Sequence, residues 1–376
     1  MMTDTSPIQT PDTAGLFRKR TKKRLLLLGV SFLVLLFSVL LDISWGPSDL
    51  TVWDVIRTIF YPYTEAEIGG ATNGLTLPQV NVIVWDVRLP VAIMAVLVGA
   101  MLGVAGAEMQ TILNNPLADP FTLGISSAAA FGAALAIVFQ WQLIPDFNFF
   151  SIWDIQTGSI LVTMNAFIMA LVASVILYAF TKVRGVTAET MVLVGIAMMF
   201  TFNALLALMQ YGASETQLSQ IVFWMMGSLS RATPNKILVC LIMLGLIVPF
   251  FIRRNWALTA LRMGDDKAAS LGVNIKRLRI EMLIGISLLA ATAVAFVGTI
   301  AFVGLVGPHI ARMIVGEDQR YFLPLSAFAS GLIMSATSII SKALTPGVIY
   351  PIGIITSLIG IPFFLSLILA VRRKSW

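Results

Sequence analysis

Long apolar runs recur along this chain and constrain its fold more than any other feature. A helix needs about 20 apolar residues to cross the hydrocarbon core of a bilayer, and runs of that kind recur from residue 25 to residue 371. Of the 376 residues, 58% are apolar and only 12% are charged, whereas a soluble domain carries about 25% charged residues. The sequence therefore predicts an all-α polytopic membrane protein and excludes a water-soluble enzyme.

We expect about ten transmembrane helices within residues 25–372. The apolar runs begin near Leu25, Leu89, Phe121, Ser159, Met191, Lys236, Ile280, Gly304, Tyr321 and Pro351. Glycine and proline residues interrupt the run over 299–316, which favours a broken or short helix there. An even number of spans places both basic ends of the chain on the same side of the membrane.

The basic residues indicate which side of the membrane each loop faces. With both ends inside, 20 of the 25 Lys and Arg residues fall on the inner side. The five on the outer side are Arg57, Arg88, Arg231, Lys236 and Lys342. Because cytoplasmic loops are enriched in basic residues, both termini are predicted to be cytoplasmic. This topology also explains the basic excess, so no nucleic-acid partner is implied.

Three segments are predicted to lie outside the bilayer. Residues 1–24 form a basic cytoplasmic N-terminus that is expected to be disordered, as the polar composition of residues 1–17 indicates. The apolar run that follows lacks a small-x-small cleavage site, so it is predicted to remain as the first span. Residues 45–87 form an external segment that is partly helical over 50–60. Residues 254–278 form a cytoplasmic loop.

Several kinds of chemistry are missing from the chain. No Gly-Lys pair occurs, so there is no P-loop for ATP hydrolysis. The spans hold few ionisable residues, chiefly Glu108 and Glu281, which disfavours an ion-coupled carrier. The single cysteine, Cys240, and the single histidine, His309, exclude an internal disulfide and a zinc site of His and Cys ligands. We expect no bound cofactor or metal, and interpret His309 as a capping or packing residue.

Two patterns in the spans concern packing and transport. Gly99, Gly103 and Gly106 form a small-residue stripe that lets helices approach closely, as generic helix packing requires. The stretch from Met191 to Met226 is rich in methionine, whose flexible side chains suit either a pathway for a bulky ligand or plain core filling. Both interpretations stay open. The candidate pathway residues are Met198, Met199, Thr201 and Asn203.

The cytoplasmic loop carries the sharpest local pattern. Asp265 or Asp266 can cap a short helix, and Gly272 can take the left-handed conformation that ends one. This helix would have a small apolar face formed by Ala268, Ala269 and Leu271. Such a helix either inserts into a groove of another protein or lies in solvent, and composition alone favours the solvated loop.

Several stretches together resemble one family, the FecCD/BtuC-type permeases of bacterial ABC importers for iron-siderophores, haem and vitamin B12. The matching stretches are RLP at 88–90, GA at 99–100, GAEMQ at 106–110, NPLADP at 115–120, LGIS at 123–126, WMMGS at 224–228, the loop 264–272, FVGLVGPHIAR at 302–312, PIG at 351–353 and GIPF at 360–363. They occur in order between about residue 50 and residue 372. The polar N-terminal extension and a long external segment at 61–78 depart from the family pattern.

The resemblance implies an assembly in the bacterial cytoplasmic membrane. A second permease subunit, identical or similar, would enclose a translocation path with this one. Two ATPase subunits that use ATP and Mg²⁺ would bind on the inner side, and a substrate-binding protein on the outer side. This chain would then be a transporter subunit and not an enzyme. Two alternatives remain, a secondary carrier for a neutral metabolite and a non-transport scaffold that assembles with an ATPase.

The resemblance also implies roles for individual residues. The ATPase coupling element would comprise Gly264, Asp265, Asp266, Ala268, Ala269, Leu271 and Gly272. The cytoplasmic gate would comprise Asn115, Pro116 and Leu117 together with Thr187, Ala188 and Glu189. Arg88 and Lys342 would dock the substrate-binding protein, with anchoring at the membrane interface as the alternative. The sequence leaves open which chelate is carried and whether the second permease is a copy of this chain.

Overall fold

The computed structural model describes residues 13–48, 50–61, 71–72, 75–140, 157–184, 187–345 and 347–372. Most of these residues are helical. The first helix begins at Thr13, so the prediction of disorder is wrong for residues 13–24. Residues 1–12 lie outside the described part, as does most of the segment 61–78.

The long apolar helices match the predicted spans. Among the described residues, seven helices are long and apolar enough to cross a membrane, and three further apolar helices are shorter. They are α1 (Thr13–Ser44), α4 (Leu89–Ile112), α5 (Ile125–Phe139), α6 (Thr157–Arg184), α7 (Ala188–Gly212), α9 (Pro234–Arg253), α12 (Ile275–Val297), α13 (Val303–Val315), α14 (Gln319–Ala343) and α15 (Ile352–Arg372). The prediction of an all-α protein with about ten spans is confirmed.

Shorter elements lie at the two ends of these helices. At one end are α2 (Val52–Phe60), the two-stranded antiparallel hairpin of β1 (Ala71–Thr72) and β2 (Leu75–Thr76), α3 (Leu77–Asn81), the π-helical segment η2 (Val82–Arg88) and α8 (Glu215–Met225). At the other end are α10 (Asn255–Leu261) and α11 (Asp265–Ser270), while η3 (Pro120–Leu123) precedes α5. Helix α2 confirms that the segment 45–87 is partly helical over 50–60.

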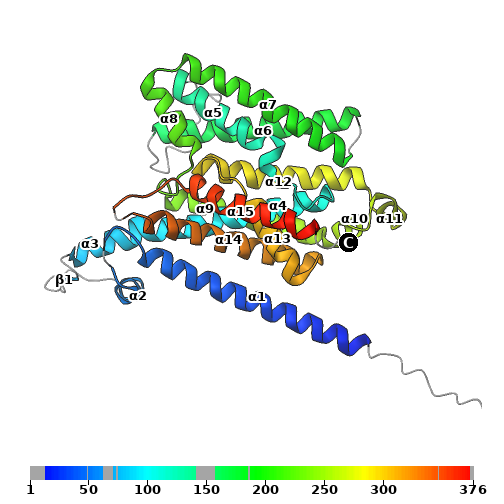
Figure 1. The fold of residues 1–376 in the computed structure, drawn as a ribbon, viewed down its shortest axis with the longest axis horizontal. Helices are drawn as coiled ribbons and strands as arrows, with labels where there is room; N and C mark the ends of the chain where they lie inside the picture. Colours follow the sequence, from blue (N-terminus) through cyan, green and yellow to red (C-terminus); the bar gives the residue numbers. More distant parts are fainter. Residues whose placement is uncertain are drawn as a thin grey trace, which may run out of the picture.

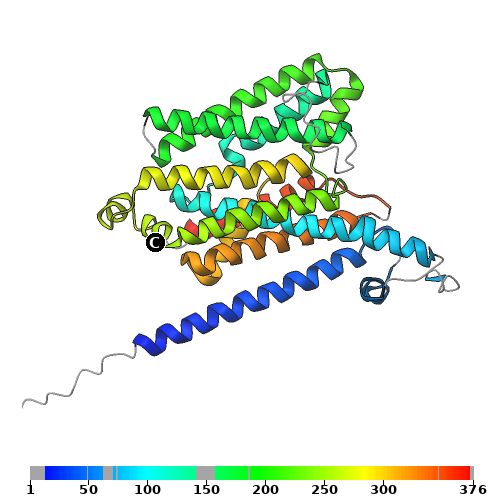
Figure 2. The same ribbon diagram turned by 180° about the vertical axis from the view of Figure 1, so that it is seen from behind.

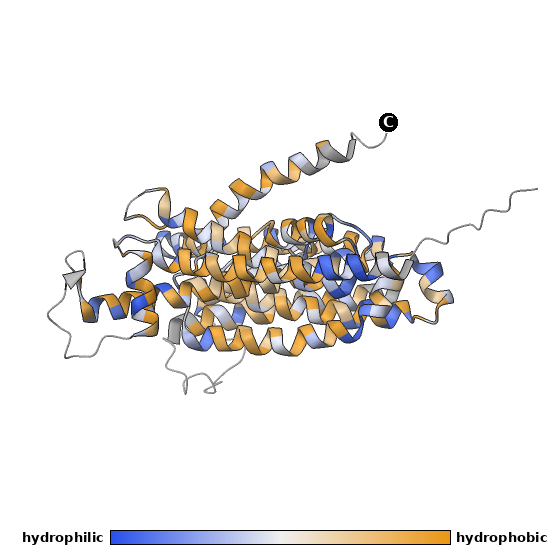
Figure 3. Ribbon diagram, turned by 90° about the horizontal axis from the view of Figure 1, so that it is seen from below, coloured by the Kyte–Doolittle hydropathy of each residue, from blue (hydrophilic) through white to orange (hydrophobic). Residues whose placement is uncertain are grey.

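The bundle is arranged in layers (Figures 1 and 2). Helices α5, α6, α7 and α8 form one side, and α1 runs obliquely along the opposite side. Helix α4 lies between them and packs against α9, α12, α13 and α14. Figure 3 shows hydrophobic residues along the middle of the bundle and hydrophilic residues mainly towards its ends. This distribution is the one a lipid bilayer requires.

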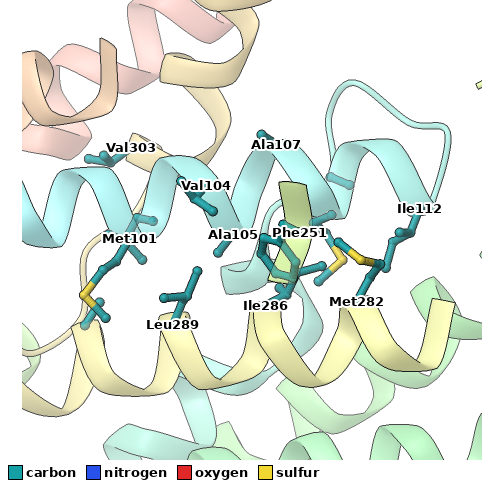
Figure 4. Close-up of a cluster of buried hydrophobic side chains, with 14 of the residues drawn as sticks. Met101, Val104, Ala105, Ala107, Ile112, Phe251, Met282, Ile286, Leu289 and Val303 are labelled. Carbon is teal, nitrogen blue, oxygen red and sulfur yellow. The ribbon is translucent and has the colours of Figure 1, made fainter. Parts of the chain in front are cut away.

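The core lies between α4 and α12. Met101 and Ala105 of α4 face Leu289 and Ile286 of α12, and Phe251 of α9 fills the space beside them (Figure 4). All five side chains are buried in one apolar cluster. A separate cluster includes the packing of α5 with α6. The central helices are therefore held by apolar packing over most of their length.

The glycine stripe of α4 brings backbones into contact. A Cβ added at Gly99 would meet the backbone of α14 near Gly331, and one at Gly103 would meet the Ser330 side chain. A Cβ at Gly106 would overlap the carbonyl group of Gly304 in α13. The interpretation of this stripe as close helix packing is confirmed.

The predicted short helix within 299–316 is confirmed as α13, but the break lies before it, and Gly304, Gly307 and Pro308, on which the prediction rested, are buried inside the helix. Helix α12 ends at Val297, and the chain turns through Gly298 at φ 85° and Phe302 at φ 69° before α13 begins. Left-handed backbone is unfavourable for a phenylalanine, so the surrounding packing must hold it. The Phe302 side chain lies directly against Gly360 of α15, where only a glycine leaves room for it.

Ion pairs fasten α1 to α14 at both ends. At one end, Arg24 Nη1 lies 3.4 Å from Asp318 Oδ2. Arg320 also hydrogen-bonds to this carboxylate, and that bond is the main reason why the pKa of Asp318 lies below its ordinary value. At the other end, Lys342 Nζ lies 2.5 Å from Asp42 Oδ1. The second pair is buried on both sides.

We predict that Gly106→Val destabilises the protein by about 1–3 kcal/mol or more, because the added side chain overlaps backbone that cannot move aside. Thermal unfolding of the purified protein in detergent would measure this. Gly245→Val in α9 is the matched control, since nothing lies within 4 Å of a Cβ added there. Equal melting temperatures of the two variants would contradict the packing of α4 on α13.

Candidate functional site

The predicted cytoplasmic helix is present as α11 and ends as expected. Gly272 has φ 82°, and its amide donates to the carbonyl of Ala269 at 2.9 Å. The amide of Val273 donates to the carbonyl of Ala268 at 3.1 Å. These two bonds form a complete Schellman motif, which ends the helix at a residue free to adopt left-handed backbone. The role of Gly272 in ending the helix is confirmed.

The start of α11 differs from the prediction. The N-cap residue is Gly264, and no side chain caps the helix. Asp265 instead forms a bidentate ion pair with Arg279, with nitrogen–oxygen distances of 2.9 and 3.0 Å. Capping by Asp265 or Asp266 is therefore wrong, because the carboxylate of Asp265 faces a buried guanidinium in the first turns of α12.

Arg279 joins α11 to the central helix. Its side chain is buried, and its Nε donates to the carbonyl of Ile112 at 3.0 Å. Ile112 is the last residue of α4, where carbonyl groups lack helical partners. One arginine thus holds the start of α11 against the end of α4. The sequence indicated that Arg279 needs a partner, since a cation beside an apolar span must find one. It did not show that the partners are the carbonyl of Ile112 and the carboxylate of Asp265.

A second connection runs from α10. The guanidinium of Arg262, just after α10, pairs with Glu317 in the loop between α13 and α14. Arg312 of α13 lies near the same carboxylate and donates to Gln110 Oε1 of α4 at 2.8 Å. Helices α10 and α11 are therefore fixed to the bundle at two separate points. A movement of these two helices should be transmitted to the bundle.

The outward surface of this loop includes exposed apolar side chains among charged ones. Ala269 is exposed, Leu271 is 49% exposed, and Met263 is also exposed. Ala268 is fully buried against the chain itself, so its predicted place on the docking face is wrong. Exposed apolar side chains beside charged residues at the tip of a loop are typical of a contact with another protein.

The predicted gate residues lie in two capped loops at the α11 end of the bundle. Asn114 is left-handed at φ 46°, and the Asn115 side chain accepts a hydrogen bond from the amide of Leu117 at 3.0 Å. Pro116 and Leu117 are exposed. Thr187 caps α7 by accepting from the amide of Thr190 at 3.2 Å.

The remaining gate candidates lie at the start of α7. Ala188 is half-buried and Glu189 is exposed. The segment after the first loop packs tightly on this helix, because a Cβ at Gly195 would meet Leu123 of η3. The structure therefore connects the segment after the first loop to α7 through η3.

A cavity of about 410 Å³ lies between α8, α15, η3 and the segment that links α12 to α13. Its lining is apolar or weakly polar, and none of the lining residues is charged. They are Phe121, Met225, Met226, Thr299, Ala301, Gly353, Ile354, Ser357, Leu358 and Ile361. Its two methionines, Met225 and Met226, belong to the methionine-rich stretch. The sequence did not indicate that residues of α15 line the same cavity.

The predicted pathway residues of α7 do not form a set. Met198 is buried in the core beside Gly124, and Met199 is half-buried there. Thr201 and Asn203 are exposed on α7. The expectation that Met198 lines a pathway is wrong, and for this residue core filling is correct. Helical geometry turns 203 well away from 198, so the candidate residues do not share one face, and the number of methionines alone does not show which side chain faces a pathway.

The single histidine packs between helices. The ring of His309 in α13 meets Phe363 of α15 edge-on, with ring centroids 6.5 Å apart. This contact agrees with the packing interpretation. No cluster of three or more His, Cys, Asp or Glu residues that could hold a metal occurs among the described residues.

Arg88 and Lys342 are structural in this chain. Arg88 is only 5% exposed and donates to the carbonyls of Ile43, Ser44 and Ser48 at 3.0, 2.9 and 2.6 Å. Lys342 has a 7% exposed side chain and is paired with Asp42. The expectation that both present cations to a partner is wrong, because the low dielectric near the bilayer makes an internal partner more favourable than exposure.

The fold and these features define a polytopic membrane permease subunit. The chain belongs to the FecCD transport family, whose sequence profile matches residues 34–370. It is 36% identical over 368 residues to a proposed ABC transporter permease protein, MJ0087, of Methanocaldococcus jannaschii, covering 95% of this chain and 98% of that protein. It is 35% identical over 294 residues to the hemin transport system permease protein HmuU of Yersinia pestis, covering 77% and 84%.

A solved structure is also similar. It is described as an inward-facing conformation of a proposed metal-chelate type ABC transporter. The TM-score is 0.74 at 26% sequence identity, and the match covers 92% of this chain and 99% of that one. The chain therefore shares the whole fold of an ABC transporter permease and not only a set of membrane helices.

We predict that Lys342→Met lowers the free energy of unfolding by about 3–5 kcal/mol, because it leaves the Asp42 carboxylate buried without its cation. Thermal unfolding in detergent would show this as a lower melting temperature. The double variant Asp42→Asn with Lys342→Met should recover most of the loss, since no buried charge remains. A single variant as stable as the native protein would contradict the structural role of the pair.

Proposed function

We propose that this chain is the permease subunit of an ABC importer for a metal chelate of the siderophore, haem or cobalamin class. Transport would cross the cytoplasmic membrane and be driven by ATP hydrolysis in partner subunits. Relatives in the family include the vitamin B12 import permease BtuC of Vibrio vulnificus and an iron chelatin permease of Helicobacter pylori. The observation that carries the proposal is the anchored helix α11, because a chain without a P-loop needs a contact through which a partner can drive it.

Helix α11 has the properties of a coupling element. It projects from the end of the bundle together with α10 (Figure 1), and it presents Ala269 and Leu271 outward. Its first residue is tied through Arg279 to the end of α4. A force applied to α11 by an ATPase would therefore reach the central helix directly. The loop 115–117 begins three residues beyond that anchoring point, which favours its role as a gate.

A second permease subunit would complete the path. Helix α15 diverges from the bundle towards the C-terminus (Figure 3), and its exposed side chains include Leu358, Ile361 and Leu365. Two of these also line the 410 Å³ cavity. A cavity with one side on an exposed apolar helix is suited to closure by a matching surface. The same chain or a similar one would supply it.

The lining of the cavity fits the proposed cargo. A chelate hides its metal inside an organic ligand, so a wall without fixed charge can pass it without binding it strongly. Flexible methionine side chains at 225 and 226 can adapt to a bulky outline. With α10 and α11 facing the ATPase, the start of α1 lies at the cytoplasmic end as well, in accord with the distribution of basic residues.

Reconstitution in vesicles tests the proposal. The permease would be purified with its ATPase, and a candidate substrate-binding protein loaded with ferric siderophore, haem or cobalamin would be added on the outer side. We expect ATP-dependent uptake of one of these ligands, with ATPase activity stimulated by the binding protein. Uptake driven by an ion gradient without ATP would support the secondary carrier, and ATPase assembly without uptake of any ligand would support the scaffold.

We predict that Ala269→Asp uncouples ATP hydrolysis from uptake while the assembled complex remains in the membrane. A carboxylate placed on the apolar docking face would be desolvated without a partner in the groove of the ATPase. Uptake and ATP hydrolysis would be measured in the same vesicles. Ala269→Ser is the matched control, because it keeps the small side chain without a charge. Normal coupled uptake by the aspartate variant would show that α11 is solvated.

We also predict that Glu108→Gln leaves uptake essentially unchanged. Glu108 is fully buried in α4 and does not line the cavity, and the amide has nearly the same shape as the carboxyl group. An ion-coupled carrier that used this group to bind its coupling ion would lose activity. Initial uptake rates at equal protein levels would distinguish the two mechanisms. A collapse of uptake would favour the carrier.

A further inference from the structure

Helix α2 is a short amphipathic helix seated firmly on the bundle. Thr51 and Asp54 form a capping box at its start, with the Thr51 amide donating to the Asp54 carboxylate at 2.9 Å. On its inner face, Val55 is buried with Val80 and Val84 in a small apolar cluster. Trp85 Nε1 also donates to the carbonyl of Thr58 at 3.2 Å. The orientation of α2 is therefore fixed.

The outer face of α2 carries an exposed aromatic surface. Trp53 is 71% exposed, Phe60 is 70% exposed, and Tyr61, just after the helix, is 74% exposed. A spacing of seven residues places Trp53 and Phe60 on one side of the helix, away from Val55, and Tyr61 follows Phe60 directly. Large aromatic side chains on a fixed surface are unfavourable in water, and together they indicate a partner.

The position of α2 identifies that partner. The helix follows α1, whose exposed side chains Leu33 and Phe37 form a lipid-facing surface of a transmembrane span. Trp45, exposed at the end of α1, continues this surface towards α2. Figure 2 shows α2 nearly end-on beside that end of α1, so its axis runs across the membrane helices and along the plane of the membrane surface.

We infer that α2 is an interfacial anchor, with Trp53, Phe60 and Tyr61 seated among lipid headgroups at this surface of the bilayer. Tryptophan and tyrosine are enriched at membrane–water interfaces, where an apolar ring and a polar group are both satisfied. An amphipathic helix in the membrane plane uses the same principle. The cavity of the proposed path is formed by α8 and α15, away from α1 (Figure 1), so a protein above the path does not need this face.

The anchor would fix the outer part of the central helix. The cluster beneath α2 includes Ala92 of α4 and Ile43 of α1. Lipid contact at α2 therefore sets the height of both helices relative to the bilayer surface. This inference depends on the membrane-spanning fold and not on the transported ligand, so failure of the proposed substrate class would leave it intact.

Spin labels on the full chain in lipid nanodiscs test the inference. Cys240 is the only cysteine and is buried, so Cys240→Ala provides the background for single labels at Trp53→Cys and Phe60→Cys. Collision rates with oxygen and with a water-soluble nickel chelate report depth. Phe37→Cys on α1 is the lipid control, and exposed Glu215→Cys at the start of α8 is the water control.

We expect both α2 labels to have an oxygen-to-nickel collision ratio severalfold above that of the water control and below that of the lipid control. Ratios equal to the water control would overturn the inference. Protection that appears only when a substrate-binding protein is added would also overturn it, in favour of a protein partner.

Quenching of tryptophan fluorescence needs no new cysteine, so it tests the inference even if a spin label disturbs the fold. Brominated lipids should quench less of the total tryptophan fluorescence in Trp53→Phe than in the native chain, because Trp53 lies within reach of the lipid. An equal quenched intensity in the two proteins would place Trp53 in water and overturn the inference.

Discussion

Close backbone contact between α4 and helices α13 and α14 is the constraint on which the rest of this structure depends. Gly99, Gly103 and Gly106 remove the side chains that would hold these helices apart. Inside a bilayer, apolar burial does not distinguish a neighbouring helix from lipid, so contact at this distance must come from shape and dispersion. The tight centre makes α4 a rigid axis to which the functional segments are attached.

An arginine binds backbone carbonyls at each end of this axis, Arg88 just before α4 and Arg279 of α12 beside the end of α4. At the end near α2, Arg88 binds the carbonyls of Ile43 and Ser44 in the last turn of α1 and of Ser48 just after it, and it holds the base of the segment that includes α2. At the end near α11, Arg279 binds the carbonyl of Ile112 and the carboxylate of Asp265. The arginine side chain has several donors in a fixed plane and stays charged, so it can join two segments at once. The proposed coupling helix and the proposed anchor are thus connected through one rigid helix.

Desolvation explains why cations that looked available for partners are used within the chain. A charged group near hydrocarbon is stabilised only by a close counter-charge or several hydrogen bonds. Lys342 satisfies this requirement with Asp42, which comes from a helix 300 positions earlier in the chain. The cavity wall has the opposite character, with neutral side chains from Phe121 to Ile361. Charged side chains therefore hold the helices together, whereas the wall of the proposed path has no charged side chain.

The sequence by itself determined the features that depend on neighbours along the chain. The glycines and proline near residue 304 indicated a short helix, although they lie inside α13 and the break precedes them. Apolar length gave about ten spans, because membrane thickness and backbone conformation act locally. Gly272 gave the end of α11 for the same reason, and ordered motifs such as NPLADP gave the family.

The tertiary structure alone decided which side chains meet across the bundle. Asp265 faces Arg279 and does not cap its helix, Lys342 faces Asp42 and not a partner, and Met198 points into the core. It also decided that Met225 shares a cavity with Thr299 and Ser357. These outcomes depend on how far each helix is rotated and shifted against its neighbours. Packing of distant segments sets that rotation, and no pattern along one helix records it.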